Sequence, residues 1–300
     1  MSGRTNALWL LPVLGVAALV TGAAPAPPSM NDILAVSPRS DWRPIDPADT
    51  LVMELPAGRV VIELVPAFAP KAIANIETLV HARYFDGAAI VRAQDDYVVQ
   101  WSRTDHRTLG AAKANIAPEF DLPLGRNIAF VALPDPDTYA PETGFSSDFP
   151  AARDPVQKRV WLTHCYGMVG VGRDNAADSG NGSELYAVIG QPPRNLDRNV
   201  TLVGRVVEGM ELLSTLPRGT GPLGFYEKPS QRVLIASIRL GSDFPAARRP
   251  NLEALRTDSA TFRAILQERR TRPDPWYKHS PGRIGVCNMP LPVRAATRKY

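Results

Sequence analysis

The chain has 300 residues, of which 44% are hydrophobic and 21% are charged. This composition is ordinary for a globular protein and provides enough apolar material for a packed core. The formal net charge is only +4, and the basic residues are scattered apart from Arg269, Arg270 and Arg272. A small, dispersed excess of positive charge favours solubility over nucleic-acid binding, so we expect no nucleic-acid partner.

The N-terminus has the pattern of a secretory signal peptide. Arg4 precedes an apolar stretch of about 14 residues, 7–20, and the small residues of 21–24 follow it. This length fits the apolar part of a signal peptide, whereas a membrane-spanning helix needs about 20 residues. We therefore expect residues 1–24 to be cleaved during export to the periplasm or the medium, which leaves no stable membrane span. If the segment is not cleaved, it becomes a membrane anchor.

After a flexible Pro-rich segment, expected over 25–50, the chain predicts a hairpin, a helix and two strands. Apolar residues alternate over 51–55 and 59–64, and a Pro-Ala-Gly sequence between them is typical of a β-hairpin. Pro70 lies where a helix start accepts proline, and the apolar residues after it recur at helical spacing. Two strands are expected near 89–92 and 97–101.

The rest of the chain predicts short strands separated by long loops. Residues 103–158 are irregular and rich in proline, which indicates a long loop insertion around one short strand at 127–133. Strands are expected over 160–171, 184–189, 200–207 and 232–240, and a short helix over 209–216. The C-terminal extension, 242–300, predicts one amphipathic helix over about 252–269. This order of elements favours an antiparallel barrel or an α+β sheet over a parallel fold.

Motifs for several kinds of enzyme are missing. The sequence contains no P-loop and no nucleophile elbow, and Gly170-Val171-Gly172 lacks the last glycine of a dinucleotide-binding motif. The four histidines lack the spacing of metal ligands, and we interpret each as a surface or core residue: His81, His106, His164 and His279. We therefore expect neither a cofactor nor a metal, and a hydrolase or metalloenzyme has little support.

The two cysteines, Cys165 and Cys287, leave two possibilities open. In an oxidising compartment they could form a disulfide that ties the C-terminal region to the middle of the chain. Otherwise one is a buried thiol and the other is unpaired.

Two long blocks carry the most specific signal in the sequence. Residues 58–100 begin GRVVIELVPAFAPKAIANIETL, and residues 180–216 include GSELY and the run VGRVVEGM. These blocks, together with Ile116–Phe120, resemble the cyclophilin family of peptidyl-prolyl cis-trans isomerases. The resemblance covers a domain of about 51–241. It implies a mostly β fold: a closed eight-stranded antiparallel barrel capped by two helices, here with the insertion and the C-terminal helical extension.

The resemblance also implies roles for individual residues. Arg92 falls at the position of the catalytic arginine, and Gln100 matches a glutamine that holds the substrate and the arginine. The other implied contacts of a proline-containing peptide are Tyr97, Val98, Gly170, Val171, Glu184, Tyr186 and Leu196, with Gly170 and Val171 offering backbone hydrogen bonds. The sequence departs from the family pattern at four positions: Trp101, Glu184, Asn195 and Val200.

An arginine suits this reaction because no covalent bond is made or broken. Rotation about an X-Pro amide crosses a barrier of about 18–20 kcal/mol, since amide resonance must be lost. A fixed guanidinium can donate hydrogen bonds to the prolyl nitrogen and to a nearby carbonyl as the amide twists. Such bonds are stronger in the twisted amide than in either planar form, and this difference is what lowers the barrier.

Two functions remain open on the sequence. The first is an isomerase that assists folding by acting on proline-containing segments of unfolded or exported proteins. The second is a catalytically weak or inactive module, or a chaperone, that binds proline-containing peptides on the same scaffold. Arg92 and Gln100 favour the isomerase. The four altered positions favour the binding module.

Overall fold

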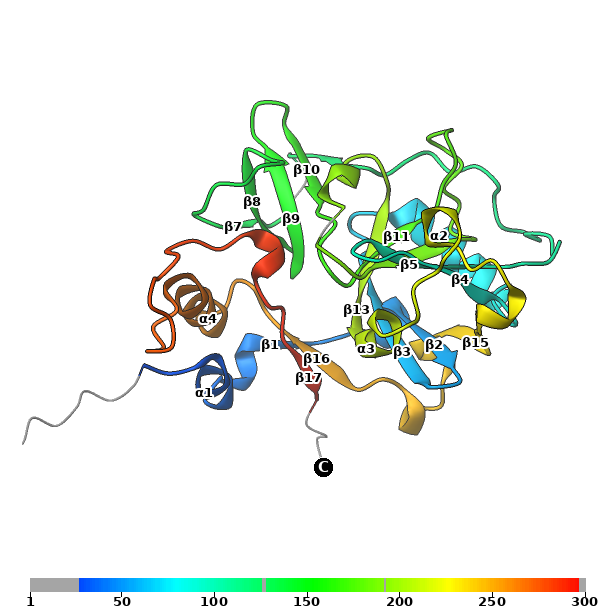
Figure 1. The fold of residues 1–300 in the computed structure, drawn as a ribbon. Helices are drawn as coiled ribbons and strands as arrows, with labels where there is room; N and C mark the ends of the chain where they lie inside the picture. Colours follow the sequence, from blue (N-terminus) through cyan, green and yellow to red (C-terminus); the bar gives the residue numbers. More distant parts are fainter. Residues whose placement is uncertain (1–26, 126–127, 192, 297–300) are drawn as a thin grey trace, which may run out of the picture.

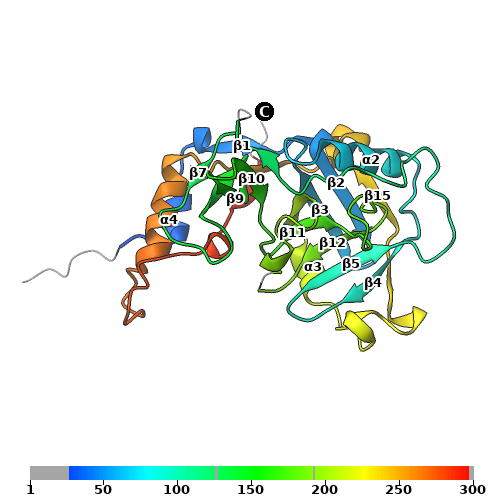
Figure 2. The same ribbon diagram turned by 90° about the horizontal axis from the view of Figure 1, so that it is seen from above.

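The computed structural model describes residues 27–125, 128–191 and 193–296, so the expected signal peptide lies outside the described residues. The described residues form four α-helices and three antiparallel sheets of three, five and nine strands. The nine-stranded sheet builds one lobe of the molecule, and the five-stranded sheet lies with helices α1 and α4 in the other (Figures 1 and 2). No helix among the described residues is long and apolar enough to cross a membrane.

The nine-stranded sheet has the order β14-β4-β5-β12-β11-β13-β3-β2-β15. Its strands are β2 (Thr50–Leu55), β3 (Gly58–Leu64), β4 (Ala89–Ala93), β5 (Val98–Ser102), β11 (Met168–Val171), β12 (Leu185–Val188), β13 (Leu202–Glu208), β14 (Val233–Leu234) and β15 (Ser237–Leu240). The β2–β3 pair confirms the expected hairpin, and helix α2 (Pro70–His81) confirms the expected helix. The apolar face of α2 packs into a core that also contains the fully buried Trp101, and the short helix α3 (Met210–Ser214) follows β13.

The sheet is a curled half-barrel of nine strands, and the expectation of a closed eight-stranded barrel is wrong. The last segment of the sheet divides between its two edges, because β14 pairs with β4 whereas β15 pairs with β2. Between them, the N–H of Ile235 donates to Ala88 and the N–H of Ala236 donates to Glu54. The local sequence shows one apolar run here and cannot show that its two ends serve different edges.

The insertion differs from the expected long loops. Together with β10 it forms a five-stranded sheet in the order β6-β10-β9-β8-β7. The strands are β6 (Leu122–Pro123), β7 (Val131–Ala132), β8 (Glu142–Ser146), β9 (Phe149–Asp154) and β10 (Arg159–Leu162). The turn between β8 and β9 is Ser147-Asp148, and both residues have positive φ angles, 50° and 64°. Such turns usually carry glycine or asparagine, so this hairpin lacked its usual sequence signal.

Early and late segments of the described chain meet in the third sheet. Strand β1 (Trp42–Pro44) pairs with β16 (Leu252–Leu255), which pairs in turn with β17 (Val293–Ala295). The segment expected to be flexible over 25–50 therefore contains β1 and helix α1 (Met30–Ala35), which lies against α4. The expected C-terminal helix begins only at α4 (Ala260–Thr271), because its first residues form β16. Strands β1 and β16 are about 200 residues apart in the sequence, so no local pattern predicts their pairing.

The three sheets meet at a buried cluster of charges. Glu63 in β3 is 3% exposed, and its carboxylate lies 2.6 Å from Arg43 in β1 and 3.2 Å from Arg205 in β13. Arg43 also lies 2.5 Å from Asp148 in the β8–β9 turn. The second carboxylate oxygen of Asp148 accepts hydrogen bonds from the N–H and hydroxyl of Thr257, just after β16. A single connected network therefore joins all three sheets.

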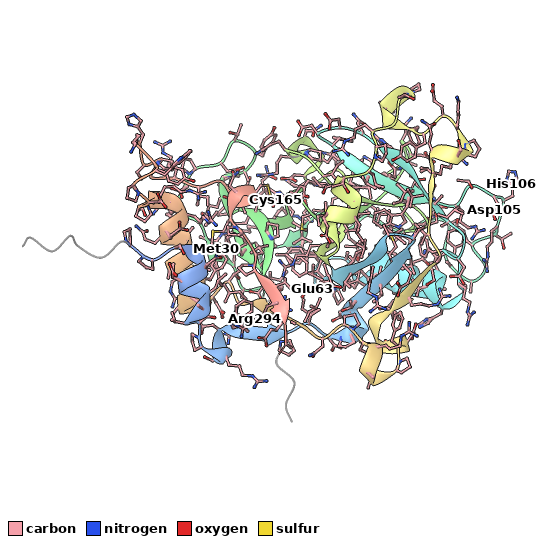
Figure 3. All side chains as sticks on the ribbon, turned by 60° about the horizontal axis from the view of Figure 1, so that its bottom comes forward. Met30, Glu63, Asp105, His106, Cys165 and Arg294 are labelled. Carbon is pink, nitrogen blue, oxygen red and sulfur yellow. A yellow bond between two sulfur atoms is a disulfide. The ribbon has the colours of Figure 1, made fainter. Side chains whose placement is uncertain are left out.

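Cys165 and Cys287 form a disulfide across 122 residues of sequence, with their Cα atoms 4.9 Å apart. Cys165 precedes β11, and Figure 3 places it inside the molecule near the C-terminal segment. Of the two possibilities left open by the sequence, the structure therefore contains the disulfide, which ties the C-terminal extension to the segment between β10 and β11.

The Glu63 cluster predicts a large loss of stability on substitution. Glu63→Gln leaves Arg43 and Arg205 without their shared counter-charge in a buried place, so we expect the free energy of unfolding to fall by about 3–5 kcal/mol. Glu54→Gln is the matched control, because Glu54 pairs with Arg59 near the surface and both side chains are about 30% exposed; it should cost less than about 1 kcal/mol. Urea denaturation measures both. Equal losses would show that the buried cluster is not what joins the sheets.

Candidate active site

Four neighbouring strands place one residue each in a row across the sheet. Arg92 in β4 lies opposite Gln100 in β5, Gln100 opposite Tyr186 in β12, and Tyr186 opposite Gly170 in β11. Directly opposed residues on adjacent strands project from the same face of a sheet. A break in the β4–β5 register between Ile90 and Arg92 sets the position of the arginine, and such bulges commonly redirect a side chain at a functional site.

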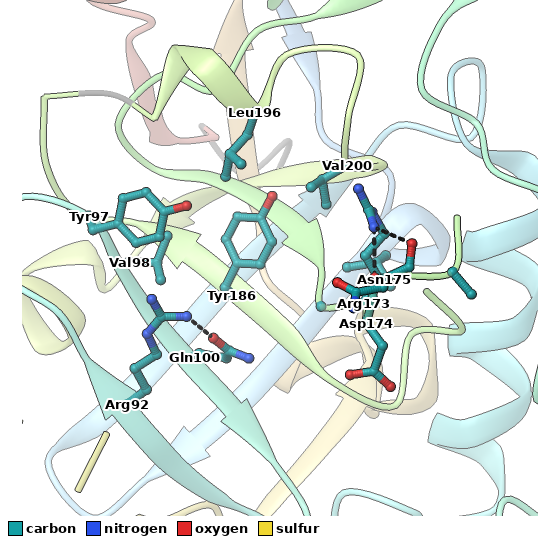
Figure 4. A pocket seen from close by; sticks show the side chains of 13 residues that line it. Arg92, Tyr97, Val98, Gln100, Arg173, Asp174, Asn175, Tyr186, Leu196 and Val200 are labelled. Carbon is teal, nitrogen blue, oxygen red and sulfur yellow. Dashed lines mark hydrogen bonds between the residues drawn. The ribbon is translucent and has the colours of Figure 1, made fainter. Parts of the chain in front are cut away.

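Three residues of this row, Arg92, Gln100 and Tyr186, line a pocket of about 710 Å³. Its lining residues are Arg92, Tyr97, Val98, Gln100, Val171, Gly172, Arg173, Asp174, Asn175, Ala176, Tyr186, Leu196 and Val200. Figure 4 shows Tyr186 between Arg92 and Gln100 on one side and the Arg173–Asn175 loop on the other. The pocket therefore has a cationic side, an apolar wall and a polar loop.

Arg92 is held in place from several directions. Its Nε donates to the Leu223 carbonyl at 2.6 Å, its Nη1 donates to Gln100 Oε1 at 2.9 Å, and its Nη2 donates to Gln94 Oε1. Its guanidinium also lies over the rings of Tyr97 and Phe225, at 5.4 and 5.3 Å. A guanidinium has five N–H donors. Among the described residues three of these donors find acceptors, which leaves two for a ligand.

Burial lowers the pKa of Arg92, while the nearby Tyr97 and Glu184 act in the opposite direction. An arginine starts so far above neutral pH that it stays charged. Partial desolvation makes its remaining donors more effective, because hydrogen bonds strengthen in a less polar environment.

Glu184 lies behind Gln100 rather than among the lining residues of the pocket. The amide nitrogen of Gln100 donates to Glu184 Oε1. Because a carboxylate only accepts, this bond turns the amide oxygen of Gln100 toward Arg92. Burial raises the pKa of Glu184, as does Asp174, whereas Arg92 lowers it. Glu184 therefore contacts Gln100 and lies outside the lining of the pocket, and its expected contact with substrate stays a prediction.

The apolar wall contains the expected side chains Tyr97, Val98, Tyr186 and Leu196, together with Val200. Gly170 serves this wall indirectly, since a Cβ atom there would lie 2.3 Å from the Tyr186 hydroxyl. The glycine lets the tyrosine ring lie flat against the sheet.

The expected backbone contacts to a peptide at Gly170 and Val171 stay a prediction, although one of the donors is already used. The N–H of Val171 already donates to the Thr201 carbonyl at 3.0 Å. Val171 lines the pocket together with the loop that follows, Gly172–Ala176. Sequence reasoning missed this loop. The available signal was its polar, glycine-containing composition directly after a strand of the sheet.

Among the described residues, no group of three or more His, Cys, Asp or Glu side chains is placed to hold a metal ion. The chemistry in the pocket is that of hydrogen-bond donors and an apolar wall.

The family model of cyclophilin-type peptidyl-prolyl cis-trans isomerases matches residues 50–240. The chain belongs to this family. Proteins of Brucella suis biovar 1 and Brucella abortus, each named a probable peptidyl-prolyl cis-trans isomerase, are 25% identical to it over 194 residues, which cover 64% of this chain and 84% of each relative. The family match and these relatives support isomerase activity for this cyclophilin.

The fold is similar to that of cyclophilin AquaCyp293 from Hirschia baltica. The two structures superpose with a TM-score of 0.67 at 24% sequence identity, over 91% of this chain and all of the other. This share is larger than the span of the family model, so the similarity extends into regions outside residues 50–240.

The contact between Gln100 and Glu184 predicts that two substitutions differ. Glu184→Ala removes the acceptor that orients Gln100, and we expect kcat/KM for a proline-containing peptide to fall by about tenfold, the scale of a charged hydrogen bond. Glu184→Gln keeps an oxygen that can accept, so its kcat/KM should stay within about threefold. Equal losses in the two variants would show that Glu184 contributes its charge rather than its acceptor.

Proposed function

We propose that this cyclophilin accelerates cis-trans isomerisation of X-Pro bonds in exported proteins and so assists their folding. The observation that carries the proposal is Arg92, a fixed guanidinium with two free N–H donors at the edge of a pocket with an apolar wall. Cyclophilin domains bind proline-containing peptides, and the apolar wall suits a proline ring.

The proposed mechanism uses no covalent intermediate. The proline ring rests against Val98, Tyr186 and Leu196 while the residue before it turns. As the amide twists, its nitrogen loses conjugation and gains a lone pair that can accept a hydrogen bond. The free donors of Arg92 then bind the twisted amide more strongly than either planar form.

Gln100 contributes rigidity to this mechanism. Its oxygen fixes one edge of the guanidinium, and Glu184 fixes the amide of Gln100 in turn. A donor that is already in place does not have to be ordered during the reaction, which favours the transition state.

Two observations support a site of action outside the cytoplasm. The N-terminal sequence has the pattern of a signal peptide. The chain contains the Cys165–Cys287 disulfide, and disulfides form and persist mainly in oxidising compartments.

Substitution of Arg92 tests the proposed mechanism. We expect Arg92→Ala to lower kcat/KM by at least about tenfold in a protease-coupled assay, because the donors to the twisted amide are lost. Arg92→Lys should also be impaired, since an ammonium lacks the planar fork that bonds Gln100 and substrate together. Arg263→Ala on the exposed face of α4 is the control.

Two outcomes separate the possible functions. An unchanged rate in Arg92→Ala would contradict the arginine mechanism. A wild-type protein that binds the peptide without accelerating it would instead be a proline-peptide binding module. Thermal unfolding of each variant establishes that a lost rate is not a lost fold.

Expression of the full sequence in a bacterium with a periplasm tests export. We expect the protein in the periplasmic fraction, with an N-terminus that begins near residue 25 and no thiol that reacts before reduction. Edman sequencing and thiol titration measure both. An intact N-terminus in the membrane fraction would indicate an anchor, and a cytoplasmic protein with two reactive thiols would contradict export.

A further inference from the structure

A series of hydrogen-bonded, buried polar side chains lies behind the apolar wall of the pocket. It begins at Tyr186 and continues through His164 and Asp197, which have no part in the mechanism above. His164 is completely buried, and its Nε2 lies 2.8 Å from the hydroxyl of Tyr186. Its Nδ1 lies 3.0 Å from Asp197 Oδ1, and its backbone N–H donates to the same oxygen at 2.8 Å. The sequence had suggested only a surface or core histidine.

The hydrogen-bond partners determine where the protons lie. Asp197 accepts from the backbone N–H of His164 and from Arg194 Nε at 2.6 Å, and a carboxylate can only accept a hydrogen bond from the ring. The Nδ1 atom of His164 therefore carries the ring hydrogen. Burial lowers the pKa of His164, more than its bond to Asp197 raises it, so the ring is neutral and Nε2 is bare. The Tyr186 hydroxyl must then donate to Nε2.

The hydrogen bond to His164 Nε2 fixes Tyr186 through its hydroxyl group. The ring forms part of the pocket wall at one face and covers Gly170 at the sheet. The rings of Tyr186 and His164 are nearly parallel, with 14° between their planes and 6.2 Å between their centroids. Tyr186 and Val98 also pack in a buried cluster with Phe145 of the five-stranded sheet. The wall of the proline pocket is thus fixed by packing and by one directed bond.

The other end of this series of hydrogen-bonded side chains lies in the lobe that contains the five-stranded sheet. Arg194 is 4% exposed and binds both oxygens of Asp137, at 3.0 and 2.9 Å. Asp137 lies between β7 and β8. The path from Asp137 through Arg194, Asp197 and His164 to Tyr186 therefore connects the insertion to the pocket wall.

We propose that His164 is a positioning residue of the isomerase site, which fixes the orientation of Tyr186 by accepting its hydroxyl hydrogen bond. The proposal rests on the proposed function, because Tyr186 matters only if the pocket holds a proline ring. His164 itself touches no substrate.

Two substitutions of His164 test its two side-chain hydrogen bonds separately. In His164→Asn the amide nitrogen replaces Nδ1, so the bond to Asp197 can be kept while the acceptor for Tyr186 is lost. In His164→Gln the amide oxygen can replace Nε2, so the acceptor for Tyr186 is kept. Each is also made together with Tyr186→Phe, which removes the hydroxyl. The exposed His106, at the far edge of the molecule (Figure 3), is changed to Asn as a control.

We expect His164→Asn to raise KM for a proline peptide about three- to tenfold, with kcat changed less than about twofold, and His164→Gln to stay within about twofold of the wild type. In the Tyr186→Phe background, the Asn and Gln variants should agree within about twofold. Nitrogen NMR of the wild-type ring should show Nε2 without a proton. Melting temperatures are measured for all variants.

Equal KM increases in the Asn and Gln variants would overturn the proposal, as would an Asn effect that persists with Phe at position 186 or a protonated Nε2. A purely structural histidine would give those results. If the wild type binds the peptide but does not isomerise it, the proposed function fails, and the same comparisons are made on Kd by calorimetry. If it neither isomerises nor binds the peptide, both proposals are overturned.

Discussion

The carboxylate of Glu63, held between the guanidinium groups of Arg43 and Arg205, is the contact on which the arrangement of the molecule depends. Each of the three sheets contributes to this buried network, and Asp148 extends it to the hairpin of the insertion. Burying charges is costly unless each has a partner. Only a structure that brings all three sheets to this point satisfies them together, so the network selects one relative placement of the lobes.

That placement matters because the pocket wall is shared. Tyr186 belongs to the nine-stranded sheet, yet it packs in the cluster that includes Phe145 of the insertion and Phe262 of α4. The hydrogen-bonded path through His164 runs in the same direction and ends at Asp137. Parts of residues 103–158 and 242–300 therefore pack behind the wall of the pocket that contains Tyr186.

The cationic side of the pocket is built within the nine-stranded sheet, by residues on adjacent strands. Arg92 and Gln100 lie opposite each other on adjacent strands, so strand register brings their side chains together. The altered residue Glu184 completes this side by orienting Gln100. Trp101, another departure from the family pattern, is fully buried in the core and leaves the pocket unobstructed. These two departures are therefore compatible with an intact arginine site.

The sequence by itself determined several local helices and strands and the two residues Arg92 and Gln100 of the candidate site. Alternation gave the β2–β3 hairpin, helical spacing gave α2, and the family resemblance gave Arg92 and Gln100, because these features depend on neighbours in the chain or on long matched blocks. Only the tertiary structure decided that the sheet is an open half-barrel, that the insertion is a sheet, and that His164 reaches Tyr186. Each of these depends on pairing between distant segments, such as β1 with β16, or on a buried side chain whose partners come from other strands. The spacing of apolar residues along the sequence does not predict such contacts.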